Sequence, residues 1–141
     1  MGALLEPLSV AIHATRRAQI TKQSSVLVMG AGAIGLLCAA MSKDTGSEHV
    51  TIADIQPDRV TFATGRAFAD FGVTIPLKKG HNVEEKLKIA QETATLACRR
   101  LETEVGSKYA FDVVFECTGA EACTQAAIFV SPEQCALWTL I

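Results

Sequence analysis

The 141-residue sequence predicts an α/β fold in which a parallel β-sheet is covered by helices on both faces. Two observations lead to this prediction. Short, almost wholly apolar segments alternate with segments whose apolar residues recur every three or four positions, and a glycine-rich turn follows the first apolar segment. Apolar strands of this kind are typical of parallel sheets, and right-handed crossovers make such a sheet doubly wound. One domain over residues 1–141 is the expectation for this length.

The composition narrows the classes of function. The chain is 49% hydrophobic and 20% charged with a formal net charge of −2, which is typical of a globular domain and gives no basis for binding nucleic acid or an anionic membrane. Its five cysteines form no C-x-x-C pair, so we expect free thiols and a reducing, cytoplasmic compartment. The N-terminal segment MGALLEPLSV lacks the basic region of a secretory signal, and we expect none.

The chain begins with a predicted helix, a strand and a second helix. Pro7 suits the first turn of a helix over residues 6–17. Its fixed φ is helical, and an N–H at this position would have no partner within the helix, so its absence costs nothing. Residues 25–30, SVLVMG, form an apolar strand. Residues 33–44 are rich in good helix formers and end near Gly46, a residue type that commonly terminates helices.

A second strand, a third helix and a third strand follow. Residues 49–54, HVTIAD, form a strand that ends on an acid. The helix over residues 57–68 opens with a proline and an acid, although Gly65 weakens it. Residues 73–77, VTIPL, form a short strand in which Pro76 indicates a sheet edge or a strand end, since proline has no N–H for the ladder.

The longest predicted helix comes next and has one apolar face over several turns. The residues of this face recur at steps of three or four and are Val83, Leu87, Ala90, Ala94, Ala97, Leu101 and Val105. Alanines make the middle of the face thin, and Ile89 and Leu96 lie beside it and broaden it. The charged residues of this segment are its solvated face.

The last predicted elements are a strand, a helix and a strand. Residues 111–119, FDVVFECTG, form an apolar strand that ends in a Thr-Gly turn, residues 120–130 form a helix, and residues 135–141 have the composition of a strand. A helix therefore precedes five strands that alternate with four helices. We expect three segments to form the centre of the sheet: Val26 to Met29, Val50 to Ala53 and Asp112 to Phe115.

A glycine-rich motif lies between the first strand and the second helix. Residues 30–35, GAGAIG, match the pattern G-x-G-x-x-G, and Asp54 ends the next strand. Alone the pattern is weak, but the strand before it, the helix after it and the acid about 20 residues further on together form the fingerprint of a dinucleotide-binding, Rossmann-type fold.

The backbone chemistry of this motif explains its residue types. Gly30 permits a tight turn, Gly32 lacks the Cβ that would block a pyrophosphate, and Gly35 lets the helix and the strand pack closely. The pyrophosphate would then lie on free N–H groups at the positive end of the helix. Asp54 would accept hydrogen bonds from the adenosine ribose, and its charge would repel a 2′-phosphate. We therefore expect NAD(H) rather than NADP(H).

Two other interpretations of the glycine-rich segment compete with this one. Residues 23–42 carry no charge and are long enough to span a bilayer, but strand formers, a glycine cluster and helix formers follow one another in them. The glycines could also loosen an ordinary core segment. Neither alternative explains the spacing from the motif to Asp54.

Four stretches of the sequence resemble the zinc-containing medium-chain dehydrogenases, most closely the sorbitol and xylitol dehydrogenase group and its fungal members. They are GALLEPLSVAIHATRRA, VLVMGAGAIGLLCAAM, IADIQPDRVTFA and FDVVFECTGAEACTQAAI. Together they cover most of residues 2–129 in the order of the family. The resemblance implies a zinc- and NAD-dependent enzyme that transfers hydride between a sugar alcohol and NAD, and it allows a homo-oligomer.

The resemblance also implies roles for individual residues. Arg59 would contact the adenosine end of NAD, Ile34 and Val10 would touch the nicotinamide, and the turn at 117–119 would pass on the nicotinamide side. Each role has an alternative. Arg59 could be an arginine on a helix surface, Ile34 and Val10 could be ordinary core residues, and residues 117–119 could be an ordinary Thr-Gly turn. The candidate cofactor-binding residues are Val10, Gly30, Gly32, Ala33, Ile34, Gly35, Asp54, Arg59, Cys117, Thr118 and Gly119.

Glu6 is the one candidate metal residue. By the resemblance it faces the catalytic zinc, whereas on its own it is an acid favoured by the helix dipole. The cysteine and the His-Glu pair that complete the family's zinc site have no counterpart here, and His13, His49 and His81 are isolated in the sequence. We therefore expect a truncated nucleotide-binding domain that lacks the catalytic domain and the last strands, binds no zinc and is inactive by itself. The alternative is a non-catalytic dinucleotide-binding module or a degenerate copy.

Overall fold

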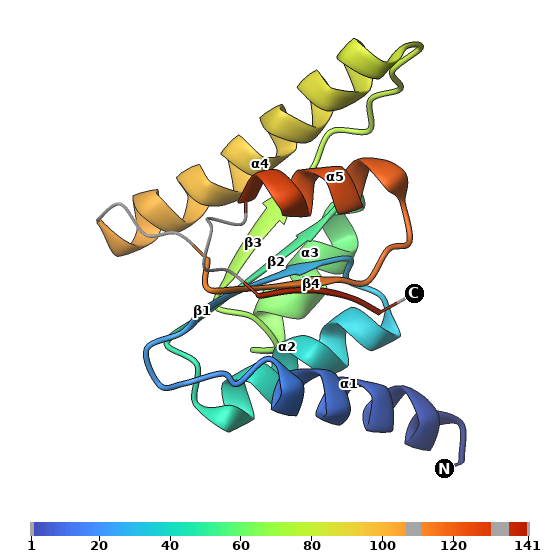
Figure 1. The fold of residues 1–141 in the computed structure, drawn as a ribbon. Helices are drawn as coiled ribbons and strands as arrows, with labels where there is room; N and C mark the ends of the chain where they lie inside the picture. The colour runs from blue at the N-terminus through green and yellow to red at the C-terminus, as the bar shows by residue number, and fades with distance from the viewer. Residues whose placement is uncertain (1, 107–110, 131–135, 141) are drawn as a thin grey trace.

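The computed structural model describes residues 2–106, 111–130 and 136–140, and within them the strands form one parallel sheet. The sheet has five strands in the order β3-β2-β1-β4-β5 (Figure 1). Their bounds are Ser25–Met29 for β1, His49–Asp54 for β2, Phe71–Thr74 for β3, Val113–Glu116 for β4 and Ala136–Thr139 for β5. Each neighbouring pair is parallel, so the prediction of a doubly wound sheet with β2, β1 and β4 at its centre is confirmed.

Helices cover both faces of the sheet. The 3₁₀ turn Gly2–Leu4 leads into α1 (Leu5–Arg17), which lies with α2 (Ala33–Thr45) and α3 (Pro57–Gly65) on one face. On the opposite face lie α4 (Val83–Val105) and α5 (Glu121–Val130), and Figure 1 shows this pair and the α1–α2 pair on either side of the sheet.

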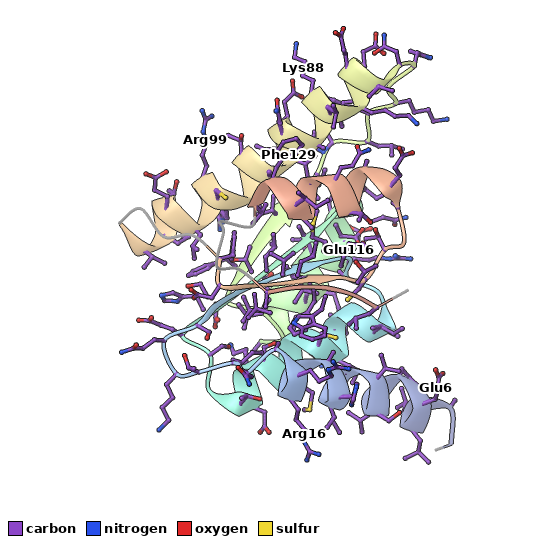
Figure 2. The ribbon with its side chains drawn as sticks, in the orientation of Figure 1. Glu6, Arg16, Lys88, Arg99, Glu116 and Phe129 are labelled. Atoms are coloured by element: carbon purple, nitrogen blue, oxygen red, sulfur yellow. The ribbon has the colours of Figure 1, made fainter. Side chains whose placement is uncertain are left out.

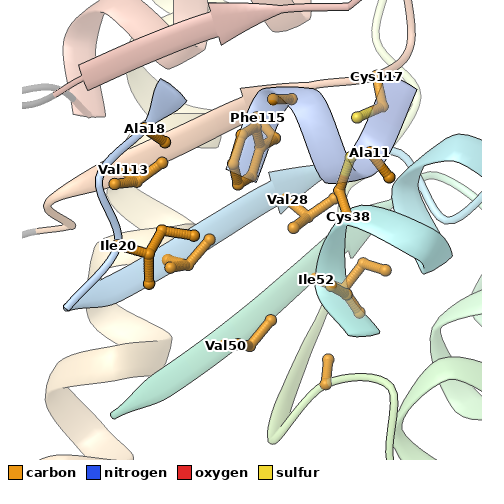
Figure 3. Close-up of a cluster of buried hydrophobic side chains, with 14 of the residues drawn as sticks. Ala11, Ala18, Ile20, Val28, Cys38, Val50, Ile52, Val113, Phe115 and Cys117 are labelled. Atoms are coloured by element: carbon orange, nitrogen blue, oxygen red, sulfur yellow. The ribbon is translucent and has the colours of Figure 1, made fainter. Parts of the chain in front are cut away.

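Alternate residues of each strand enter the two cores, as the pleat of a β-strand requires. Val26 and Val28 of β1 face α1 and α2, whereas Leu27 and Met29 face α4 and α5. Figure 3 shows the first of these clusters, in which Phe115 packs over the sheet under α1. Both faces of β1 are completely buried, which explains why its sequence is continuously apolar instead of alternating.

The strand order creates a switch point between β1 and β4. The chain builds β1, β2 and β3 outward in one direction, and after α4 it returns to pair β4 with the other side of β1. The loops that leave β1 and β4 therefore turn toward opposite faces, and a crevice opens between them at the carboxyl ends of the strands.

Several element bounds differ from the sequence predictions, the fourth strand for example being Val113–Glu116, and two of the differences have a visible physical reason. The third helix ends at Gly65 rather than at residue 68, because Ala67 has a φ of 59° and the N–H groups of Phe68 and Ala69 turn back to the carbonyl of Ala63. The strand predicted at residues 73–77 is Phe71–Thr74. Pro76 lies just beyond it, and β3 is an edge strand as its proline indicated.

The predicted apolar face of α4 is wrong in its first two turns. Ala90, Ala94, Ala97 and Leu101 are buried, whereas Val83 is 71% exposed and Leu87 is 38% exposed. The reason is the length of the helix, since the N-terminal end of α4 extends past the sheet in Figure 1. Leu96, expected to broaden the face, is 38% exposed.

The uncharged stretch 23–42 is divided between β1 and α2 and so does not form one continuous helix. Among the described residues, no helix is long and apolar enough to cross a membrane.

The two leucines of α4 test this packing. We expect Leu101→Ala to lower the free energy of unfolding by about 2–5 kcal/mol, because a completely buried side chain leaves a cavity. Leu96→Ala on the same helix is the matched control and should cost less than about 1 kcal/mol, since its side chain is 38% exposed. Urea denaturation followed by circular dichroism measures both, and an equal loss would contradict the described orientation of α4.

Candidate functional site

A cleft of about 350 Å³ opens at the carboxyl ends of the central strands. One wall contains the turn after β1 and the end of β2, a second contains the segment after β3 and one side of α4, and a third contains the loop from β4 to α5. Six of the predicted cofactor-binding residues line it: Gly30, Gly32, Asp54, Arg59, Cys117 and Thr118. These residues come from separate segments of the sequence, and the fold places them around one cleft.

The three motif glycines have different surroundings. Gly30 has a φ of 103°, and an added Cβ would lie 2.9 Å from Cγ2 of Thr118. At Gly35 an added Cβ would overlap the carbonyl oxygen of Gly30. At Gly32 an added Cβ would meet nothing within 4 Å, although this residue lines the cleft. Gly30 and Gly35 are therefore required by the fold itself, and the fold leaves free space beside Gly32.

Helix α2 begins at the cleft without a side-chain cap. Its N-cap residue is Gly32, in an extended conformation with a ψ of −174°, and its first turn contains no acidic residue. The first N–H groups of a helix have no intrahelical partner and carry the positive end of the helix dipole. The start of α2 can therefore bind an anion in the free space beside Gly32.

Asp54 connects the glycine turn to the end of β2. The residue is 8% exposed, and its Oδ2 accepts a hydrogen bond of 2.7 Å from the Ala31 N–H, while Oδ1 accepts one of 2.8 Å from the Gln56 N–H. The sequence predicted that Asp54 accepts hydrogen bonds from a ribose, but it did not predict that two main-chain N–H groups donate to the carboxylate. Each carboxylate oxygen can accept a further hydrogen bond, so the same side chain can hold the turn and contact a ligand.

Glu116 orders the opposite loop, and sequence reasoning missed it. This fully buried residue ends β4, where Oε1 accepts hydrogen bonds from the N–H and the hydroxyl of Thr118, and Oε2 accepts one of 3.2 Å from the Gly119 N–H. Figure 2 shows Glu116 in the interior between the helical layers. An acid at the end of an apolar strand, two residues before the Thr-Gly pair, was the available signal.

The cysteines near the cleft are thiols and not thiolates. Contact with Cys38 and burial raise the pKa of Cys117, and Figure 3 shows the two residues on neighbouring elements of one core. Burial likewise raises the pKa of Cys123, which lines the cleft. All four cysteines in the described part of the chain are free, and Cys135 lies outside it. Cys117 and Cys123 are therefore poor nucleophiles at neutral pH, because the thiolate is the reactive form.

The remaining candidates do not line the cleft. Val10 lies in a separate groove with Trp138, between α1 and β5. Ile34 packs half-buried against the core, and Ala33 is exposed in the first turn of α2. Gly119, with a φ of 69°, shapes the loop that contains Thr118.

Glu6 stands apart from the cleft. It is exposed in the first turn of α1, near the N-terminal end of the chain in Figure 2. Across residues 2–106, 111–130 and 136–140, no three His, Cys, Asp or Glu side chains lie close enough together to hold a metal ion. The described residues therefore do not fit a zinc centre, which needs about three protein ligands.

Comparison with known proteins identifies the chain's relatives. Residues 7–137 match the model of a family described as pyridine nucleotide-disulphide oxidoreductase. The chain is 38% identical over 130 residues to "Probable D-xylulose reductase A" of Arthroderma otae, and 36% identical over 130 residues to the sorbitol dehydrogenase of Homo sapiens. Each alignment covers 92% of this chain and 32% of the relative, so the chain spans about a third of the length of these relatives. The resemblance to the sorbitol and xylitol dehydrogenase group is confirmed.

A solved structure supports the fold. The crystal structure of a protein from Sinorhizobium meliloti 1021, classed as a zinc-binding dehydrogenase and bound to NADP, superposes with a TM-score of 0.70 at 22% sequence identity. The superposition covers 95% of this chain and 34% of that one. The Rossmann-type fold is therefore confirmed.

Alanine substitutions at Gly35 and Gly65 distinguish the effect of close packing on stability from the effect of helix propensity. Gly35→Ala should lower the free energy of unfolding by about 1–3 kcal/mol or more, because the new Cβ displaces the Gly30 carbonyl. Gly65→Ala is the matched control, with nothing within 4 Å of its Cβ, and should be neutral or stabilising by about 0.4–1 kcal/mol. Thermal and urea unfolding measure both, and a tolerated Gly35→Ala would show that α2 does not depend on this approach.

Proposed function

Because this chain belongs to the pyridine nucleotide-disulphide oxidoreductase family, we propose that residues 1–141 are the NAD(H)-binding domain of a zinc-dependent polyol dehydrogenase. One observation carries the nucleotide part of this proposal. The uncapped start of α2 adjoins free space beside Gly32, in the same cleft as the carboxylate of Asp54. A pyrophosphate and an adjoining ribose need these two partners next to each other.

The cofactor would lie across the switch point between β1 and β4. Its pyrophosphate would accept hydrogen bonds from the N–H groups at the start of α2, and the side-chain-free face of Gly32 admits it. Asp54 would accept hydrogen bonds from the ribose hydroxyls. Ile55 and Ala120 line opposite parts of the cleft and offer an apolar setting for the adenine, with Arg59 at its edge.

The nicotinamide half would pass the loop that Glu116 orders. The turn at 117–119 lies against Gly30, and Ile34 follows in the first turn of α2, so these residues would flank the ring. Val10 would approach it from α1. When bound, the nicotinamide accepts or donates the hydride. The part of this chain is to hold the ring and to exclude water from one side of it.

The proposal concerns nucleotide binding and not disulphide chemistry. The raised pKa values of Cys117 and Cys123 keep the thiols beside the cleft protonated. The polyol substrate comes from the named relatives, a sorbitol dehydrogenase and a D-xylulose reductase.

The catalytic zinc would come from outside the residues described here. In the proposed whole enzyme, a zinc ion would act as a Lewis acid on the substrate oxygen, and Glu6 would face it. We further propose a cytoplasmic homo-oligomer by the same resemblance. Light scattering during size-exclusion chromatography tests the oligomer, and a monodisperse monomer would oppose it.

A second candidate function is a dinucleotide-binding module without catalysis. The observation that favours it is the scattered placement of potential metal ligands in the described part of the chain, where Glu6 stands alone at one end of α1. Turnover by the purified chain separates the two candidates.

The choice of cofactor tests the nucleotide site. We expect NADH to bind at least about tenfold more tightly than NADPH, a difference of about 1.4 kcal/mol, because the Asp54 carboxylate repels a 2′-phosphate. Asp54→Asn keeps the side-chain shape and should weaken NADH binding and narrow this preference. Gly32→Asp is the control, since a carboxylate in the pyrophosphate space should abolish binding of both. Titration of NADH fluorescence measures each affinity, and equal affinities in the parent chain would refute the role of Asp54.

Activity tests the proposed division between binding and catalysis. We expect the purified 141-residue chain to show no polyol dehydrogenase activity with NAD, zinc and sorbitol, xylitol or arabinitol. The physical reason is that acceleration requires groups acting on the charge that develops on the substrate oxygen, and the zinc ligands that the resemblance implies are not in this sequence. NADH absorbance is the readout. Turnover above that of Gly32→Asp would contradict the proposal.

A further inference from the structure

Two cationic side chains, Arg59 and Lys78, line the same cleft as Asp54. Arg59 reaches it from the first turn of α3, and Lys78 reaches it from the segment after β3. The N–H of Ile75 donates a 2.9 Å hydrogen bond to the carbonyl of Asp54, so this segment starts directly beside the acid. Lys78 follows three residues later and lines the cleft.

Lys78 is not free to act as a cation in the cleft. Its Nζ lies 2.6 Å from Oε2 of Glu92, and the side chains are 49% and 42% exposed. Glu92 is on α4 between Ile89 and Thr93, which line the cleft, but Glu92 itself lies outside the lining. The hydrogen bond from Lys78 lowers the pKa of Glu92, so the carboxylate is ionised at neutral pH.

We propose that Glu92 is a specificity-determining residue, which disfavours NADP(H) by pairing with Lys78 and withholding an uncompensated ammonium group from the mouth of the cleft. This inference rests on the proposed function. A free ammonium beside the ribose would attract a 2′-phosphate, which carries nearly two negative charges at neutral pH. The Asp54 carboxylate repels the 2′-phosphate inside the cleft. Glu92 pairs with Lys78 and so weakens the attraction between that ammonium group and the 2′-phosphate. The two effects act at different places, because Asp54 lines the cleft and Glu92 lies outside its lining.

The test uses two ligands that differ only by the 2′-phosphate, 5′-AMP and 2′,5′-ADP, with calorimetry on the full chain. Glu92→Gln should tighten binding of 2′,5′-ADP by about three- to tenfold and leave 5′-AMP within about twofold, because the gain acts only on the added charge. The gain should shrink in about 1 M salt, where the Debye length falls to about 3 Å. The pair is exposed, and circular dichroism checks that the variant is folded.

Two further variants separate this effect from general charge. Glu104→Gln also removes an ion pair from α4, that with Arg100 at 2.8 Å, and changes the net charge equally, but neither residue lines the cleft. It should leave the ratio of the two affinities unchanged. Lys78→Met added to Glu92→Gln should abolish the gain.

The outcomes distinguish the two proposals. If neither ligand binds the parent chain, the proposed function fails and the inference fails with it. If both bind but the ratio is unchanged in Glu92→Gln, shifts equally in Glu104→Gln, or keeps its gain without Lys78, the role of Glu92 is overturned and the nucleotide site stands.

Discussion

The close approach of α2 to β1 is the constraint on which the rest of the site depends. Gly35 lies so near the carbonyl oxygen of Gly30 that no side chain fits between the helix and the strand. This contact brings the first turn of α2 to the carboxyl end of the sheet and leaves its N–H groups at the mouth of the crevice. The positive φ of Gly30 makes the turn possible, and the space beside Gly32 is what remains for a ligand.

Two buried carboxylates hold the walls of the crevice, and both do so through main-chain N–H groups. Asp54 accepts from Ala31 and Gln56 at the end of β2, and Glu116 accepts from Thr118 and Gly119 at the end of β4. Charge-assisted hydrogen bonds of this kind are stronger than neutral ones. Loops without regular secondary structure are thus held in place on both sides of the switch point. The cationic side chains lie at the rim, where Lys78 is already paired.

This arrangement suits the proposed task of binding a nucleotide. The sheet and its two helical layers place a helix N-terminus and an acid at one cleft. Nothing in that arrangement requires groups that act on an alcohol. The relatives are about three times as long as this chain, and in the proposed whole enzyme a separate part of the protein would bind substrate and metal. Binding by this domain and catalysis by another is therefore a consistent division.

The sequence by itself determined the order of the elements, the parallel sheet and the glycine turn, because apolar periodicity and glycine placement reflect local geometry and burial. The spacing from Gly35 to Asp54 also predicted a shared site, since consecutive parallel strands end at one edge. Only the tertiary structure decided that the start of α4 projects into solvent, that Glu116 orders the loop after β4, and that Glu92 pairs with Lys78. Periodicity shows which residues share a helix face but not how far the helix extends past the sheet, and contacts between distant segments depend on packing that no local pattern contains.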